Sequence, residues 1–220
     1  MKKAIVIGGT GLVGRHLVDI LISDPRFHQI VSLVRRTSGR KHEKLQEQII
    51  NFDKPDEWQH LIEGDVLFSA LGTTLRQAGG KDAQYKVDFT YQYEVAKAAA
   101  SNGVPSYVLV SSSGANPNAA IFYPRMKGEL EVAVRKLPFK SIAILQPSLL
   151  VGKREKSRTG EEWGYKMLSG LNKLGFLKKY RPIEGSTVAR AMIAGALSEH
   201  QGIRTYSLQD LFELADSTVV

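Results

Sequence analysis

The sequence predicts an α/β fold built on a doubly wound parallel sheet with helices on both faces. Short apolar runs of strand length alternate with longer segments whose apolar residues recur at helical spacing. Strands that are apolar throughout are typical of parallel sheets, and right-handed crossovers then wind such a sheet in two directions. A glycine-rich turn directly after the first apolar run supports the same architecture. We expect the 220 residues, 1–220, to form a single domain.

Six apolar runs justify the strands of this sheet. In chain order the expected strands are residues 4–7, 30–34, 49–52, 65–70, 107–110 and 141–145, and residues 206–208 are an expected edge strand. The expected helices are residues 12–22, 82–101, 123–136 and 186–197. Asn102 and Gly103 end the second helix, and Ser186 is the candidate N-cap of the last one.

The segment that follows the sixth strand differs from the rest of the chain. It is rich in charge and glycine and contains no clear strand. Because ligands of open α/β sheets bind at the carboxyl ends of the strands, we expect residues 152–185 to form a small C-terminal lid over that crevice. The expected substrate contacts from this lid are Arg158, Glu161, Glu162 and Trp163.

Composition excludes several classes of protein. Hydrophobic residues make up 43% of the chain and charged residues 24%, which is ordinary for a globular protein. No apolar run approaches the roughly 20 residues of a membrane span, and the N-terminal run is too short for a signal peptide. We therefore expect a cytoplasmic location and no membrane attachment. The chain has no cysteine, and its five histidines lack metal-ligand spacing, so we expect no metal site.

The net charge of +8 favours an anionic ligand or surface. The basic residues are scattered over loops, and no nucleic-acid-binding motif accompanies them. We therefore prefer a solvated basic surface to nucleic-acid binding. Nothing in the sequence indicates an oligomer, although one is compatible with it.

Residues 8–14 read Gly-Gly-Thr-Gly-Leu-Val-Gly and connect the first expected strand to the first helix. We expect Gly8 to permit the tight turn, Gly11 to let the backbone approach a pyrophosphate, and Gly14 to let the helix pack closely on the strand. The start of the helix then presents free N–H groups to the phosphates. The cofactor-binding residues expected from this turn are Gly8, Thr10, Gly11, Leu12, Val13 and Gly14.

The end of the second strand indicates which dinucleotide binds. NAD sites typically place an acidic residue there, whereas this chain has Arg35 and Arg36. Guanidinium groups can bind a 2′-phosphate, so NADP(H) is favoured over NAD(H). Asp53, after the third strand, is either an acceptor for the adenine amino group or an ordinary turn residue. The expected neighbours of the cofactor ribose groups are Ala70, Leu71 and Gly72.

Tyr123 and Lys127 form a Tyr-x-x-x-Lys pattern. Residues four apart share one face of a helix, and a nearby ammonium favours the tyrosinate form. Such a tyrosine can exchange a proton with an alcohol or a carbonyl. Pro124 is compatible with the first turn of a helix, which would place Tyr123 near the rim of the sheet. The alternative is a surface tyrosine stacked on a lysine stem.

These motifs together resemble the short-chain dehydrogenase/reductase superfamily. The matching pieces are the glycine turn, the serines Ser111–113 at the end of the fifth strand, and Tyr123 with Lys127. The chain looks most like the atypical, Tat-interacting-protein-like branch. The segments that carry this closer likeness, over almost the whole chain, are residues 71–74 with Arg76 and Gly79, 110–116, 127–131 and 187–192.

The resemblance implies an NADP(H)-binding Rossmann fold with a Ser–Tyr–Lys site. It makes Tyr123 the acid/base and Lys127 its activator and a ligand of the nicotinamide ribose. It implies Ser112 as the catalytic serine, with Ser113 as the close second choice. Pro147, after the sixth strand, resembles the family's proline beside the nicotinamide.

The expected function is therefore that of an NADP(H)-dependent oxidoreductase that reduces a small carbonyl substrate. Two departures from the family pattern bear on the prediction of catalysis more than on the prediction of cofactor binding. The serines lie only 10 to 12 residues before Tyr123, and the sequence lacks a full substrate domain. The alternative hypothesis is an NADPH-binding regulatory or scaffold protein with little or no turnover.

Overall fold

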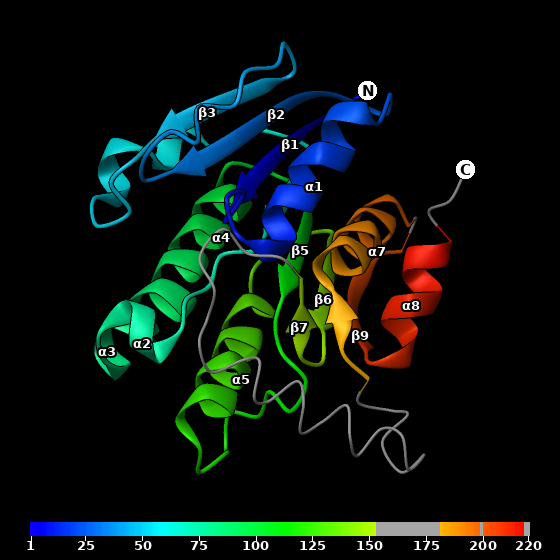
Figure 1. Ribbon diagram of the computed structural model, residues 1–220. Helices are drawn as coiled ribbons and strands as arrows, with labels where there is room; N and C mark the ends of the chain where they lie inside the picture. The colour runs from blue at the N-terminus through cyan, green and yellow to red at the C-terminus, as the bar shows by residue number, and fades with distance from the viewer. Residues whose placement is uncertain (153–180, 199, 218–220) are drawn as a thin grey trace.

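A computed structural model of the chain describes residues 1–152, 181–198 and 200–217 (Figure 1). The main sheet has seven strands in the order β3-β2-β1-β4-β5-β6-β9, and its pairs are parallel. The strand order runs one way from β1 to β3 and the other way from β1 to β9, which confirms the doubly wound sheet. The strands are β1 (Lys2–Ile7), β2 (Phe27–Val34), β3 (Leu45–Ile49), β4 (Val66–Ser69), β5 (Ser106–Val110), β6 (Ser141–Gln146) and β9 (Gly202–Ser207).

Helices cover both faces of the sheet, as expected (Figure 1). One layer contains α1 (Leu12–Ser23), α7 (Gly185–Leu197) and α8 (Gln209–Asp216), and the other contains α4 (Tyr91–Ser101) and α5 (Phe122–Val134). Successive strand side chains point to opposite faces, so Val6 belongs to the first core and Ile5 to the second. The two hydrophobic cores fix the sheet between the layers and leave its carboxyl-terminal edge available for ligands.

Two predicted elements are wrong in their limits. The third strand is β3, Leu45–Ile49, and not residues 49–52. Residues 50 and 52 are buried after the strand ends, so apolar residues outside the strand attracted the prediction. The helix expected over residues 82–101 is divided into α3 (Lys81–Tyr85), the π-helical turn η3 (Lys86–Thr90) and α4. Residues 82–101 contain no Gly or Pro that would mark a break, so the sequence does not show the change to π-helical bonding.

The C-terminal part contains elements that the sequence did not predict. The expected edge strand at residues 206–208 is the longer β9, and α8 follows it. A small second sheet pairs β7 (Leu150–Val151) with β8 (Ile183–Glu184). The remaining short elements are η1 (Pro55–Glu57), η2 (Gln59–Leu61) and α2 (Leu75–Ala78).

The expected lid lies mostly outside the described residues, as do its four candidate substrate contacts, Arg158, Glu161, Glu162 and Trp163. Within the described parts of the chain, none of the helices combines the length and the apolar character that crossing a membrane requires.

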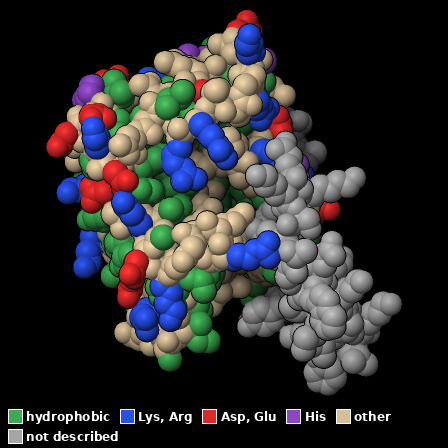
Figure 2. All heavy atoms as spheres, turned by 60° about the vertical axis from the view of Figure 1, so that its left-hand side comes forward, with side chains coloured by type: hydrophobic (Ala, Val, Ile, Leu, Met, Phe, Trp, Pro, Cys, Tyr) green, Lys and Arg blue, Asp and Glu red, His purple; other side chains and the backbone are tan. Residues whose placement is uncertain are grey.

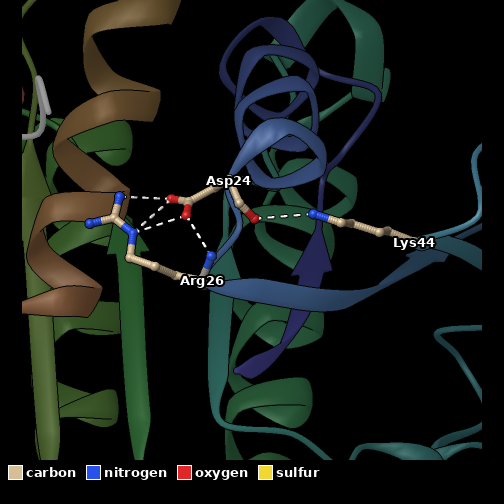
Figure 3. Close-up of polar contacts among 3 residues, drawn as sticks. All are labelled: Asp24, Arg26 and Lys44. Carbon is tan, nitrogen blue, oxygen red and sulfur yellow. Dashed lines mark hydrogen bonds and ion pairs between the residues drawn. The ribbon is translucent and has the colours of Figure 1, made fainter.

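The amino-terminal edge of the sheet is held by an ion pair between α1 and β2 (Figure 3). The Arg26 guanidinium donates to both carboxylate oxygens of Asp24, at 2.9 Å from Nε and 2.7 Å from Nη2. Lys44 donates to the Asp24 backbone carbonyl at 3.2 Å. The hydrogen bond from Arg26 lowers the pKa of the Asp24 carboxyl and outweighs the opposing effect of burial. These contacts connect the end of α1 to the residues that precede β2 and β3.

Candidate functional site

At two positions of the glycine turn, Gly8 and Gly14, the neighbouring backbone leaves no room for a side chain. Gly8 has φ +81°, and a Cβ on it would lie 2.4 Å from the backbone of Ala70. A Cβ on Gly14 would lie 2.1 Å from the Gly8 carbonyl oxygen. Side chains at these positions would push the turn away from the end of β4. The sequence therefore brings the start of α1 against the carboxyl-terminal edge of the sheet.

The first turn of α1 fits a phosphate group. Gly11 is the N-cap residue and, because it has no side chain, it does not itself cap the N–H groups that follow it. Free N–H groups and the helix dipole favour an anion at this position. The turn thus provides the cradle that a dinucleotide pyrophosphate requires, on geometry as well as on sequence spacing.

A cavity of about 330 Å³ opens beside this turn. Figure 2 shows a hollowed face on which Lys and Arg side chains stand beside hydrophobic and neutral surface. The cavity wall joins the turn after β1, the loop after β4 and the start of α5. The predicted site residues that it brings together are Thr10, Gly11, Leu12, Val13, Ala70, Leu71, Gly72, Tyr123 and Lys127.

Tyr123 and Lys127 lie one turn apart near the beginning of α5. The Lys127 ammonium nitrogen is 5.9 Å from the centre of the Tyr123 ring. Tyr123 is 39% exposed, whereas the Lys127 side chain is only 3% exposed. The tyrosine hydroxyl can therefore meet a ligand from solvent, while the lysine acts from within the cavity wall.

Lys127 is paired with a carboxylate that sequence reasoning missed. Its Nζ lies 3.4 Å from Oδ1 of Asp88, and both side chains are almost fully buried. The other oxygen of Asp88 accepts the Thr73 N–H at 2.8 Å. Asp88 lies in the π-turn η3, a distortion that is frequent at functional sites. A signal was available, because Gln84, Asp88 and Gln92 form a polar row four residues apart on a buried face.

The three serines after β5 have different surroundings. Ser111 is the one that lines the cavity, and its hydroxyl donates to Glu131 Oε1 at 2.5 Å. The hydroxyl of the half-buried Ser112 donates to the Ser113 carbonyl at 3.3 Å. The Ser113 N–H donates to the Pro147 carbonyl at 2.9 Å, which ties this loop to the end of β6. The assignment of Ser112 as the catalytic serine stays a prediction.

A second hollow lies at the ends of β2 and β3. Arg35 and Asp53 both line it, together with Tyr91. Asp53 Oδ1 accepts the Tyr91 hydroxyl at 2.7 Å and pairs with Lys86 at 2.6 Å. The hydrogen bond from Lys86 lowers the pKa of the Asp53 carboxyl. Arg35 and Asp53 therefore share one hollow, and Arg36 is exposed in the same loop as Arg35.

Other functional candidates were not singled out from the sequence. Arg15, Thr73, Gln77 and Leu150 also line the main cavity. In the described parts of the chain, no group of three His, Asp or Glu side chains could hold a metal ion.

The chain is similar to known proteins over its whole length. The sequence model of the NAD dependent epimerase/dehydratase family matches residues 4–133. A protein of Aspergillus clavatus named "Protein fmp52, mitochondrial" is 32% identical, with 100% of this chain and 97% of that protein covered. The "Protein FMP52, mitochondrial" of Candida glabrata is 33% identical, with coverage of 98% and 97%. These names contradict the expected cytoplasmic location, because the relatives that match the whole chain are called mitochondrial.

Solved structures share the fold at low sequence identity. A UDP-N-acetylglucosamine 4-epimerase from Methanobrevibacter ruminantium, in complex with UDP-N-acetylmuramic acid, has a TM-score of 0.71 and 19% identity. The match covers 96% of this chain and 80% of that one. The Bordetella bronchiseptica enzyme WbmH, in complex with NAD⁺, has a TM-score of 0.73 and 18% identity, with coverage of 99% and 80%. Together with the family match, these structures confirm the expected relation to the short-chain dehydrogenase/reductases.

Proposed function

This chain belongs to the NAD dependent epimerase/dehydratase family, and from that premise we propose that it binds NADP(H) and reduces a small carbonyl compound. One observation carries the proposal: a single cavity joins the uncapped start of α1 to the side chains of Tyr123 and Lys127. A phosphate cradle and an acid/base pair on the same wall are the two parts that dinucleotide-dependent carbonyl chemistry requires.

The residues at the end of β2 support the 2′-phosphorylated cofactor. Arg35 and Arg36 supply guanidinium groups, which bind phosphate strongly. The acidic residue near this loop, Glu47, already accepts from Thr37 Oγ1 at 2.6 Å and from the Ser38 N–H at 2.8 Å. The carboxylate of Glu47, in β3, is thus occupied by the loop that follows β2, so we do not assign it to the hydroxyl groups of an NAD ribose.

The residues of the cavity have separate roles in the proposed reduction. When bound, the nicotinamide ring supplies or accepts the hydride. Tyr123 holds the proton that the carbonyl oxygen takes up, and Ser112 donates a hydrogen bond to that oxygen. Lys127 places its ammonium beside the tyrosine ring and would hold the nicotinamide ribose, and Asp88 holds the lysine in place.

Calorimetric titration with NADPH and NADH tests the cofactor. We expect tighter binding of NADPH, and we expect Arg35→Ala/Arg36→Ala to weaken NADPH about 10- to 100-fold because each phosphate contact contributes about 1–2 kcal/mol. The affinity for NADH should change little. Equal losses for both dinucleotides would refute the 2′-phosphate assignment, and no binding of either would refute the proposed function.

Turnover of NADPH with a panel of small aldehydes and ketones tests the reaction. We expect Tyr123→Phe to reduce the rate about 10²- to 10⁴-fold, which is the usual contribution of a general acid, and to leave NADPH affinity nearly unchanged. A Tyr123→Phe variant with full activity would refute the mechanism. Tight NADPH binding without turnover across the panel would favour a regulatory or scaffold protein instead.

A further inference from the structure

We propose that Glu131 is the positioning residue of this site, which fixes the face of α5 that carries Tyr123 and Lys127 against the ends of β5 and β6. The inference rests on the proposed function for its meaning in catalysis, since it concerns how the acid/base pair is held. None of the motifs considered in the sequence includes a role for this glutamate. The evidence for this role is a network of polar contacts around Glu131, behind the wall of the cavity.

Glu131 is a buried carboxylate, with only 6% of the residue exposed. Its Oε1 accepts the Ser111 hydroxyl at 2.5 Å, and Gln146 Nε2 donates to Oε1 at 2.9 Å and to Oε2 at 3.1 Å. Ser111 follows the last residue of β5, and Gln146 is the last residue of β6. One side chain of α5 therefore joins the carboxyl ends of two neighbouring strands.

The network continues to the edge of the sheet. Arg135 lies one turn after Glu131, and its Nη2 is 3.6 Å from Glu131 Oε2. The same nitrogen donates to Thr205 Oγ1 in β9 at 2.7 Å. Glu131 and Arg135 thus attach α5 to three consecutive strands, β5, β6 and β9.

Glu131 lies on the same face of α5 as the acid/base pair, so fixing Glu131 also fixes that pair. Tyr123, Lys127 and Glu131 follow one another at intervals of four, so they lie one above another along the helix. A carboxylate buried with several partners is costly to remove, because Ser111 and Gln146 would lose their acceptor. The position of the helix along the rim is therefore set at Glu131, one turn from the lysine.

The network also decides what Ser111 can do. A serine hydroxyl has one proton, and Ser111 gives that proton to Glu131. Although Ser111 lines the cavity, its hydroxyl can then accept from a ligand but cannot polarise a carbonyl. Its contribution is to anchor Glu131, so Ser111 is not the donor to the substrate carbonyl in the proposed mechanism.

Glu131→Ala, compared with Glu129→Ala, tests the proposal. Glu129 is the matched control because it is a half-exposed glutamate of the same helix, 3.9 Å from Arg125. The titrants are NADPH and 2′,5′-ADP, which lacks the nicotinamide half. We expect Glu131→Ala to weaken NADPH about 10- to 100-fold by displacing Lys127, and to leave 2′,5′-ADP within about twofold. Glu129→Ala should change neither affinity.

A purely structural role would weaken both titrants together or neither, and either result overturns the proposal. Glu131→Gln gives a second variant of nearly the same shape, whose amide oxygen can still accept from Ser111. We expect it to lose NADPH affinity less than Glu131→Ala does. An equal loss would show that the carboxylate's place in the network is not what matters.

A measurement without ligand separates this inference from the proposed function. Lys127 is 3% exposed, so acetylation of its amine should be slow in the unmodified chain. If Glu131 holds α5, Glu131→Ala should speed the acetylation of Lys127 about tenfold relative to the exposed Lys97, as followed by mass spectrometry. An unchanged rate would overturn the inference, whereas failure of the chain to bind either titrant would refute only the proposed function.

Discussion

The two edges of the sheet each contain a buried aspartate paired with a cation, but the pairs differ in geometry. At the amino-terminal edge, Arg26 donates from both Nε and Nη2 to the carboxylate of Asp24 while its own side chain remains 48% exposed (Figure 3). At the carboxyl-terminal edge, Lys127 and Asp88 are 3% and 2% exposed, and 3.4 Å separates them. The first cation keeps its water, whereas the second has lost almost all of it.

The difference in exposure between the two ion pairs separates a stabilising contact from a contact that can serve a ligand. The Asp24–Arg26 ion pair is bidentate and half-exposed, so it stabilises the connection between α1 and β2 at little desolvation cost. A buried ammonium with one long carboxylate contact is costly, and it retains donors that a ligand can use. At the carboxyl-terminal edge, holding the Lys127 ammonium in place therefore costs stability. The ion pair at the amino-terminal edge offsets part of that cost.

The largest expected effect is that of Asp88→Ala. Without its carboxylate, the Lys127 ammonium would be buried alone, which costs about 3–5 kcal/mol of unfolding free energy. The double variant Asp88→Ala/Lys127→Met should recover most of that loss, because neither charge of the buried pair remains. Urea unfolding measures both variants. A double variant as unstable as the single one would remove the contrast between the two edges.

A somewhat smaller effect is expected from the cofactor itself. NADPH at about 100 times its Kd should stabilise the folded chain by about 2.7 kcal/mol, because it binds the folded state only. Asp24→Asn should keep this gain, since Asp24 lies at the opposite edge, whereas Lys127→Met should lose part of it. Thermal unfolding with and without NADPH shows which edge the ligand stabilises. Equal gains in both variants would separate Lys127 from the cofactor.

Asp24→Asn should cost about 2 kcal/mol of unfolding free energy, because the amide replaces a charge-assisted pair of hydrogen bonds with a weaker one. NADPH affinity should remain within about twofold of the unmodified chain. A change in NADPH affinity comparable to that of the arginine variants would mean that the edges are coupled.

The smallest effect concerns acid pH. Arg26 lowers the pKa of Asp24 in the folded state, so the carboxylate stabilises the fold above the ordinary pKa of an unfolded Asp. That contribution declines as the pH falls from about 4 towards the lower folded pKa. The difference in unfolding free energy between the unmodified chain and Asp24→Asn should therefore be constant from pH 5 to 7 and shrink below pH 4, in urea titrations at each pH. A pH-independent difference would contradict this account.

The parts of the fold that depend on local pattern could be predicted from the sequence. Apolar runs located most strands of the buried sheet, and the glycine spacing located the turn, whose steric reasons at Gly8 and Gly14 the structure supplies. The edge strand β3 was misplaced because its residues are half-exposed and polar, so no burial pattern marks them. An edge strand takes its position from a neighbour, and a linear pattern does not contain that neighbour.

The site was predictable only where motifs define it. Tyr123 and Lys127 belong to a recognisable spacing, whereas Asp88 and Glu131 are acidic residues in helices and resemble solvated surface charges. Their roles depend on partners 39 and 20 residues away in the chain, Lys127 and Ser111, that the sheet brings beside them. The spacing of Gln84, Asp88 and Gln92 at intervals of four is the one sign in the sequence, and it does not identify the partner.

The π-turn that carries Asp88 has a consequence for insertions and deletions. Deleting one residue from Lys86–Thr90 would restore ordinary α-helical bonding and rotate α3 by about 100° about the helix axis. Gln84, whose side chain donates to the Thr73 carbonyl at 3.2 Å, would then leave the loop after β4. The number of residues from Gln84 to Gln92 is thus constrained, and an alignment of functional homologues should contain no gap in this interval.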